Sequence, residues 1–193
     1  AFGQKELLGL AYRTDHDLKA HTGMSKVDLS YFDEETKARF IPHCIEPTFG
    51  LDRLVLAVLS DAYSEDALSA ASKEGEGEKA ESADAEKRIF LKFAKQIAPM
   101  KAAVSPLLKN KPELVAKAQE VWKMLRAIEP NIMFDDNGNI GKRYRRQDEI
   151  GTPYCITIDF QTLEDSTVTV RHRDNGQQER VHIDSLVQTL FND

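Results

Sequence analysis

The feature that most constrains the fold is a stretch near the middle of the chain that has almost no apolar residues. Residues 64–88 consist mainly of Ser, Glu, Ala, Lys and Gly, with eight Asp or Glu against four Lys or Arg. A segment of this composition buries too little apolar surface to offset the entropy lost on ordering it. We therefore predict a flexible acidic linker or insertion over 64–88, which separates a folded part at 1–63 from another at 89–193.

The overall composition is typical of a soluble globular protein, with 41% hydrophobic and 30% charged residues. No apolar run approaches the roughly 18 residues that a membrane span requires, and no signal-peptide core is present. Cys44 and Cys155 lie among apolar neighbours without CxxC spacing, which indicates buried thiols in a reducing compartment, so we expect a cytoplasmic protein. Because the chain starts without Met, inside an apparent strand, we expect it to be part of a longer protein.

The part at 1–63 shows one strand pattern and one helix pattern. A buried strand is predicted from its apolar residues Leu7, Leu8, Leu10 and Ala11. Residues 31–40 are predicted to form a polar connector. After a chain reversal at Gly50, apolar residues at 51, 54, 55, 58, 59 and 62 follow one face of a helix.

The part at 89–193 alternates strand and helix patterns, which predicts a self-sufficient α/β domain. Strands are expected at 100–104, 132–134, 154–160, 167–171 and 179–183. Asp174-Asn175-Gly176 separates the last two, a strong hairpin signal. Helices are expected from Pro112 to about 129 and around Leu186–Phe191.

Ile45–Arg53 combines an apolar strand, a carboxylate, a glycine turn and an arginine in the first turn of a helix. A cation is unfavourable at a helix N-terminus, so Arg53 is better explained by a phosphate ligand. Glu46 would then meet a substrate ammonium group. A structural ion pair between Glu46 and Arg53 explains the spacing equally well.

The run Lys142–Glu149 places Tyr144 among four basic residues and before acidic ones. A solvated helix face is the usual meaning of such a run. Proteins also recognise single-stranded RNA with aromatic and guanidinium groups that lie beside hydrogen-bond acceptors. The residues alone leave both interpretations open.

Three segments, in the same order along the chain, resemble one enzyme family. Ile45–Arg53 resembles motif 3 of class II aminoacyl-tRNA synthetases, in the form found in single-polypeptide, homodimeric glycyl-tRNA synthetases. Lys5–Leu18 is similar to the strand before motif 3, and Ile140–Pro153 to a signature of the family's anticodon-binding domain. The resemblance implies the tail of an antiparallel α+β catalytic domain at 1–63 and a mixed five-stranded α/β anticodon-binding domain at 89–193.

The family's activity is ATP-dependent formation of glycyl-adenylate and its transfer to tRNA(Gly). By this resemblance Glu46 binds the glycine ammonium, Glu6 lines the same pocket, and Thr48 closes its floor where the family usually has Ser. Glu46 also borders ATP, and Arg53 acts as the catalytic residue that holds the γ-phosphate. Arg13 has either a site role or a structural pairing with Asp15 or Asp17. The motif 2 arginine is missing, so we expect the chain to be inactive alone.

The resemblance also implies the partners. The expected anticodon contacts are Arg143, Tyr144, Arg145, Arg146, Asp148 and Glu149. The arginines would meet phosphates or stack on bases, and Asp148 or Glu149 would accept from a cytosine amino group. ATP would bring Mg²⁺, no cofactor would be tightly bound, and the full protein would be a homodimer that binds neither membrane nor DNA.

Two alternatives are a non-catalytic homologue that serves as a nucleic-acid-binding accessory subunit, and a class II synthetase for proline, threonine or histidine. Glu6, Glu46 and Arg53 occur together, which argues against the non-catalytic homologue. The residues of the segments Ile45–Arg53 and Ile140–Pro153 resemble glycyl-tRNA synthetases more closely, which argues against the other synthetases. No metal site is expected, because residue 140 is Ile where a calcium loop starting at Asp135 requires Gly, the closing Glu of such a loop is missing, and the histidines lack zinc spacing.

Overall fold

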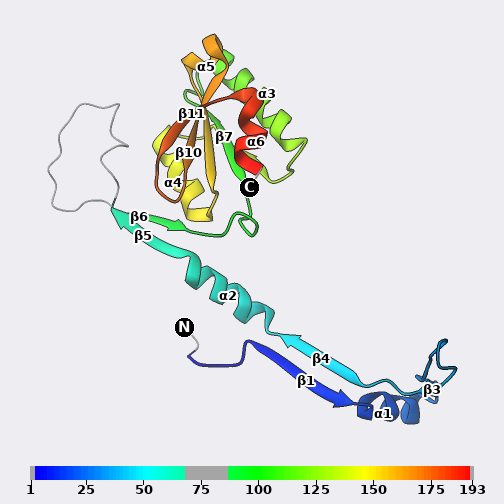
Figure 1. The fold of residues 1–193 in the computed structure, drawn as a ribbon. Helices are drawn as coiled ribbons and strands as arrows, with labels where there is room; N and C mark the ends of the chain where they lie inside the picture. The colour runs from blue at the N-terminus through cyan, green and yellow to red at the C-terminus, as the bar shows by residue number, and fades with distance from the viewer. Residues whose placement is uncertain (1–2, 68–86, 192–193) are drawn as a thin grey trace. The chain divides into compact units, whose positions relative to one another are not determined.

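The computed structural model describes residues 3–67 and 87–191, and it divides into two compact units, Ala1–Val58 and Leu59–Asp193 (Figure 1). The boundary between the units falls within the helix α2 (Leu51–Ala62), which was predicted after Gly50. Residues 68–86, the middle of the predicted linker, lie outside the described residues. Each unit is described by itself below.

The first unit is built on two antiparallel strands, β1 (Leu8–Thr14) and β4 (Cys44–Phe49), which pair Gly9 with Thr48 and Ala11 with Glu46. Between them lie α1 (His16–Ser25) and a short hairpin of β2 (Tyr31–Phe32) and β3 (Arg39–Phe40). This hairpin replaces the polar connector that was predicted there.

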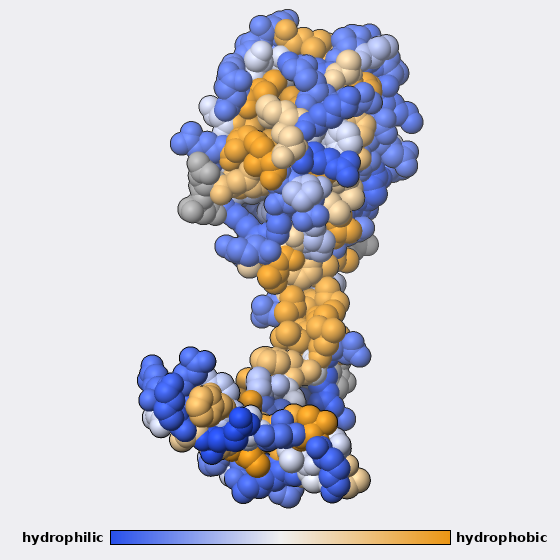
Figure 2. Space-filling view, turned by 90° about the vertical axis from the view of Figure 1, so that its right-hand side faces the viewer, coloured by the Kyte–Doolittle hydropathy of each residue, from blue (hydrophilic) through white to orange (hydrophobic). Residues whose placement is uncertain are grey.

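The predicted burial of the first strand is wrong for this chain. Leu10 of β1 is 72% exposed and Leu8 is also exposed, because no described layer covers either face of the two-stranded sheet. Apolar side chains of α2 are exposed as well, and the surface of this helix is therefore orange in Figure 2. The exposed large apolar residues of this helix are Leu51, Leu54, Val55, Leu56 and Leu59.

The ends of the predicted linker are ordered. Strand β5 (Tyr63–Ala67) follows α2 directly and pairs antiparallel with β6 (Lys87–Leu91). Side chains of β6 alternate between faces, so that Arg88 and Phe90 are buried while Ile89 is exposed. The prediction of an unstructured segment over the whole of 64–88 is therefore wrong at both of its ends.

The second unit contains the predicted mixed five-stranded sheet, with the order β11-β10-β9-β7-β8. Strand β7 runs parallel to its neighbours β8 and β9, while β10 is antiparallel to β9 and β11. The strands span Ala102–Pro106 (β7), Ile132–Phe134 (β8), Tyr154–Ile158 (β9), Thr167–His172 (β10) and Gln178–His182 (β11). The α/β fold class is thus confirmed.

One face of this sheet carries the hydrophobic core. Helix α3 (Pro112–Arg126) begins with Pro112 in its first turn and buries Leu114, Ala118, Val121 and Leu125. Together with η2 (Ile183–Ser185) and α6 (Leu186–Phe191) it packs on alternate residues of the central strands. Those strand residues are Ala102, Val104, Tyr154, Ile156, Ile158, Val168 and Val170.

The opposite face is covered by α4 (Ile140–Ile150), which lies across the sheet from α3 and α6 (Figure 1). Strand β9 ends at Ile158 rather than at the predicted Phe160, because Asp159 caps the unpredicted helix α5 (Phe160–Asp165) in a capping box with Thr162. Side chains at 157, 169 and 171 alternate with the core residues and so face the α4 side. A groove forms there.

Candidate functional site

A small pocket in the first unit brings together three of the predicted site residues. Its volume is about 390 Å³, and Glu6, Thr48 and Arg53 line it together with Leu7, Phe49, Gly50, Leu51 and Asp52. The guanidinium of Arg53 donates to the backbone carbonyl of Glu6 at 2.6 Å, from Nη1 to oxygen. This contact ties the start of α2 to the segment that precedes β1.

Glu46 does not line this pocket. It lies two residues before Thr48 on β4, and its Oε2 accepts from Nε of Arg13 at 2.7 Å. Asp17 lies 3.8 Å from the same Arg13 nitrogen, and the hydrogen bond with Glu46 raises the Arg13 pKa. The ion pair that the sequence allowed between Glu46 and Arg53 is therefore formed with Arg13 instead.

Gly9 is a residue of this site that the sequence reasoning missed. A Cβ atom at Gly9 would lie 2.7 Å from Oγ1 of Thr48 and 3.1 Å from Oε1 of Glu6. Only glycine lets the two side chains approach the strand so closely. An isolated glycine inside an apolar strand was the signal available for it.

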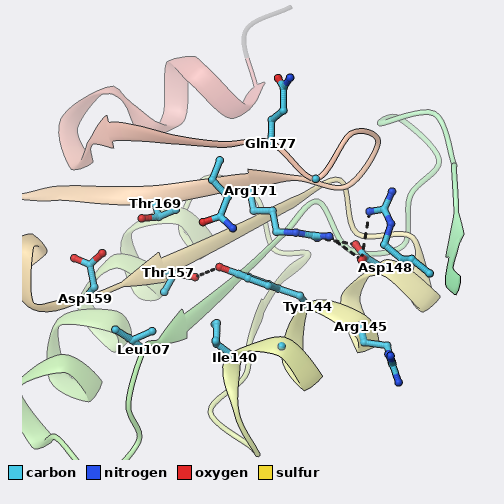
Figure 3. A pocket seen from close by; sticks show the side chains of 14 residues that line it. Leu107, Ile140, Tyr144, Arg145, Asp148, Thr157, Asp159, Thr169, Arg171 and Gln177 are labelled. Atoms are coloured by element: carbon cyan, nitrogen blue, oxygen red, sulfur yellow. Dashed lines mark hydrogen bonds and ion pairs between the residues drawn. The ribbon is translucent and has the colours of Figure 1, made fainter. Parts of the chain in front are cut away.

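The groove on the second unit is larger, with a volume of about 780 Å³ (Figure 3). Strands β9 and β10 form its floor, α4 forms one wall, and the β10–β11 turn borders it. Lining side chains include Tyr144, Arg145, Thr157, Asp159, Thr169, Arg171 and Gln177. One further residue, Arg88, comes from β6.

Tyr144 is the aromatic group of this groove. Its hydroxyl shares a 2.7 Å hydrogen bond with Oγ1 of Thr157, and the Arg171 guanidinium carbon lies 4.9 Å from its ring centroid. Burial raises the pKa of Tyr144, so the phenol is neutral over the physiological range. Both side chains line the groove, Tyr144 half-buried and Arg171 7% exposed.

A buried ion cluster closes one end of the groove. The Asp148 carboxylate accepts two bonds from Arg171, at 2.8 and 3.0 Å, and its Oδ2 lies 3.5 Å from Nη1 of Arg88 (Figure 3). Arg88 also binds Asp66 of β5 through two nitrogens, at 2.9 and 2.5 Å. The four formal charges of this cluster cancel.

Two residues predicted to contact RNA are instead part of the interior. Arg143 is 1% exposed and donates to the backbone carbonyls of Pro106, Asp136 and Gly138, and burial lowers its pKa. Asp148 is 2% exposed and fully engaged in the ion cluster. Neither can meet a phosphate or a base edge without leaving its partners, so both assignments are corrected.

The other predicted RNA contacts lie on accessible parts of α4. Arg146 forms a bidentate pair with Asp135, with nitrogen–oxygen distances from 2.8 to 3.1 Å. Arg145 and Glu149 are exposed, and Arg145 lines the groove. Sequence reasoning missed Arg171, although the alternation of Val168 and Val170 on the core face places Arg171 on the other face.

The described residues include no cluster of three or more His, Cys, Asp or Glu side chains that could bind a metal ion. Within the same ranges, no helix is long and apolar enough to cross a membrane. Cys155 is buried, as predicted, and burial raises its thiol pKa to about 12, whereas Cys44 is only half-buried.

Comparisons with known proteins agree with this architecture. Residues 101–192 match a family model described as an anticodon binding domain. The chain is 51% identical over 96% of its length to a glycine–tRNA ligase of Thermobifida fusca (strain YX), and 48% identical over 98% to one of Clostridium tetani (strain Massachusetts / E88). It spans 37% of the length of each of these relatives.

One match among the solved structures is the RNA binding domain of threonyl-tRNA synthetase from Cryptosporidium parvum Iowa II. Its sequence identity is 24% and its TM-score is 0.47, over 51% of this chain and 24% of that one.

Proposed function

We propose, because the chain belongs to the glycyl-tRNA synthetase family, that it takes part in the ATP-dependent ligation of glycine to tRNA(Gly). In this reaction glycine first attacks ATP to give glycyl-adenylate and pyrophosphate, and the glycyl group then passes to the terminal adenosine of the tRNA. The chain would supply one wall of the glycine and ATP pocket and the domain that binds the anticodon loop.

The groove beside α4 is the observation that carries the RNA-binding part of this proposal. Unpaired bases bind by stacking on aromatic or guanidinium planes and by hydrogen bonds to their exposed edges. Tyr144 offers such a plane with the largely buried Arg171 guanidinium beside it, Asp159 and Thr169 offer hydrogen-bonding groups nearby, and Gln177 does so from the bordering turn. An anticodon loop seated here would also meet Arg145 at the rim.

Anticodons for glycine end in two cytosines, whose exocyclic amino groups donate hydrogen bonds to carboxylates. With Asp148 buried, the acceptors that remain within reach are Glu149 on the exposed side of α4 and Asp159 on the groove floor. Asp159 already accepts from Arg180, so a base would have to share its carboxylate. Glu149 is the reader that we propose.

For the glycine pocket we propose the roles that the family resemblance assigns. Glu6 and Thr48 shape the space for a substrate without a side chain, and Arg53 holds the ATP γ-phosphate. The resemblance assigns the ammonium group to Glu46, whose carboxylate is held by Arg13 outside the lining of this pocket. The co-location of Glu6, Thr48 and Arg53 in one pocket supports this assignment. Mg²⁺ would enter with the phosphates of ATP, and its ligands would come largely from the nucleotide.

Apolar side chains exposed on β1 and α2 suit burial against further parts of a longer chain. We therefore propose that this chain is catalytically inactive by itself, and that the complete protein acts as a cytoplasmic homodimer. Glycine-dependent pyrophosphate exchange by the isolated 193-residue chain would contradict the first of these statements.

The RNA-binding proposal is tested by binding of the tRNA(Gly) anticodon stem-loop to Glu149→Ala and Arg145→Ala variants. Arg145→Ala should weaken binding by about tenfold, the scale of one lost base or phosphate contact. The matched control, Arg126→Ala on α3, removes the same charge on the opposite face of the sheet and should bind normally. Equal loss in both arginine variants would contradict a role for the groove.

Glu149→Ala tests base recognition itself. It should weaken the cognate stem-loop more than a stem-loop in which uracil replaces the two cytosines, since uracil lacks the amino donor. Equal weakening of both stem-loops would show that Glu149 does not discriminate the base.

A further inference from the structure

We infer that Arg88 is a positioning residue of the RNA groove, and that the β5–β6 hairpin is therefore part of the anticodon site. This inference rests on the proposed function of the groove. Arg88 lies outside residues 101–192, which match the anticodon binding domain. Its guanidinium nevertheless lines the groove together with Asp148 and Arg171.

Burial and hydrogen bonds hold the Arg88 side chain more tightly than a residue in a simple connecting segment would need. It is 7% exposed, and every nitrogen of its guanidinium has a partner. Nε and Nη2 donate to Asp66, and Nη1 donates to the Arg173 carbonyl at 2.6 Å while lying 3.5 Å from Asp148. The guanidinium carbon also lies 4.2 Å from the Phe90 ring centroid.

This arrangement acts on Arg171 from two directions. Arg88 fixes the Asp148 carboxylate, which in turn holds both terminal nitrogens of Arg171. It also fixes the backbone at Arg173, two residues beyond Arg171 and just past the end of β10. Arg171, itself 7% exposed, is thereby kept against the Tyr144 ring, and both side chains line the groove.

Stability alone does not account for this cluster. A buried ion pair is often no more stabilising than apolar side chains of the same volume, because desolvation opposes the Coulombic attraction. A carboxylate that accepts hydrogen bonds from two nitrogens of one guanidinium, as Asp148 does from Arg171, fixes the orientation of the guanidinium plane. Arg88 supplies this geometry from a strand that the sequence pattern assigned to a linker.

The test uses the full-length synthetase and four variants: Arg88→Gln, Arg171→Gln, the double variant, and Lys87→Gln. Lys87 is the matched control, because it precedes Arg88 on β6, carries the same charge and pairs with Glu65 on the exposed face. The measurements are kcat and KM for tRNA(Gly) in glycylation, tRNA-independent pyrophosphate exchange, and the melting temperature.

Arg88→Gln should raise the KM for tRNA(Gly) by between about threefold and about a hundredfold, the range of coupling between residues in one network. Pyrophosphate exchange should be unchanged, because the glycine and ATP site does not use Arg88. The double variant should be no worse than Arg171→Gln, since Arg88 acts through Arg171. Lys87→Gln should behave like the wild type.

Three results would overturn the inference: equal effects of Arg88→Gln and Lys87→Gln, additive effects in the double variant, or a parallel loss of pyrophosphate exchange. Asp66→Asn provides a second variant if Arg88→Gln does not fold, because it loosens Arg88 from its outer side and keeps its charge. It should raise the KM for tRNA(Gly) by a smaller factor than Arg88→Gln does. Combined with Arg171→Gln, it should again give a double variant no worse than Arg171→Gln alone. A wild-type protein that does not glycylate tRNA(Gly) would instead refute the proposed function.

Discussion

Substitution of Gly151 by Ala should destabilise the second unit by about 2–5 kcal/mol. Gly151 ends α4 with φ of +80°, a left-handed conformation that is unfavourable by about 1–2 kcal/mol for a residue with a side chain. The added Cβ would lie 2.4 Å from Cδ2 of Phe93 and 2.8 Å from the Leu91 carbonyl oxygen. The carbonyl belongs to the backbone and cannot rotate away, so overpacking adds about 1–3 kcal/mol.

Two other glycines of the same region separate these contributions. Gly138 has φ of +78°, but the nearest atom to an added Cβ is Lys142 Cβ at 3.8 Å, so Gly138→Ala reports backbone strain alone. Gly141 lies in the first turn of α4 with normal φ, and its nearest neighbour would be Asn139 Oδ1 at 3.8 Å. Gly141→Ala should stabilise the helix by up to about 1 kcal/mol.

The assay is urea unfolding followed by fluorescence of Trp122, the single tryptophan of the chain, which packs in the second unit. Stability should fall in the order Gly141→Ala, wild type, Gly138→Ala, Gly151→Ala. If Gly151→Ala unfolds at the same urea concentration as Gly138→Ala, the close packing of residues 91–93 against the end of α4 is refuted. The claim that the β5–β6 hairpin belongs to this unit would then lose one of its supports.

Three further outcomes follow from the geometry. In the full-length protein, Gly9→Ala should raise the KM for glycine, because the new methyl group would displace the Thr48 hydroxyl; an unchanged KM would contradict the pocket. Iodoacetamide at pH 8.5 should alkylate Cys44 before Cys155, whose pKa of about 12 keeps it protonated, and mass spectrometry of folded and urea-unfolded protein distinguishes them. The hydrogen bond from Arg88 lowers the pKa of Asp66, so the stability that this carboxylate confers is present at neutral pH and is lost as pH falls below about 4. Urea midpoints of wild type and Asp66→Asn should therefore converge in acid, and a constant difference would contradict the pairing.

The elements that sequence predicted well are those specified by local periodicity. The apolar stripe of α3, the Asp174-Asn175-Gly176 turn between β10 and β11, and the helix after Gly50 all appear as expected. Each of these elements depends on residues that are close together in the chain, so its pattern can be recognised in the sequence. The alternation of strand and helix patterns over 89–193 predicted the α/β domain, and the family resemblance implied its five-stranded mixed sheet.

The errors concern charged residues whose partners are distant in sequence. Arg143 and Asp148 lie in a polar run, and polar runs usually face solvent. Arg143 donates to the Pro106 carbonyl, 37 residues away, as well as to two nearby carbonyls, and Asp148 pairs with Arg171 and Arg88, 23 and 60 residues away. No local pattern distinguishes a charge that is buried with such partners from one that is solvated.

The ion cluster also bears on how an acidic protein can bind RNA. The formal charge of the chain is −6, of which residues 64–88 contribute −4, so the net charge provides no general attraction for RNA. A neutral cluster that orients Arg171 against Tyr144 offers a stacking surface without adding net charge to the groove. Binding of this kind depends on the fit of particular bases more than on the release of counterions from phosphates. In the proposed function, Arg88 would contribute to selectivity by fixing the shape of the surface on which a base is placed.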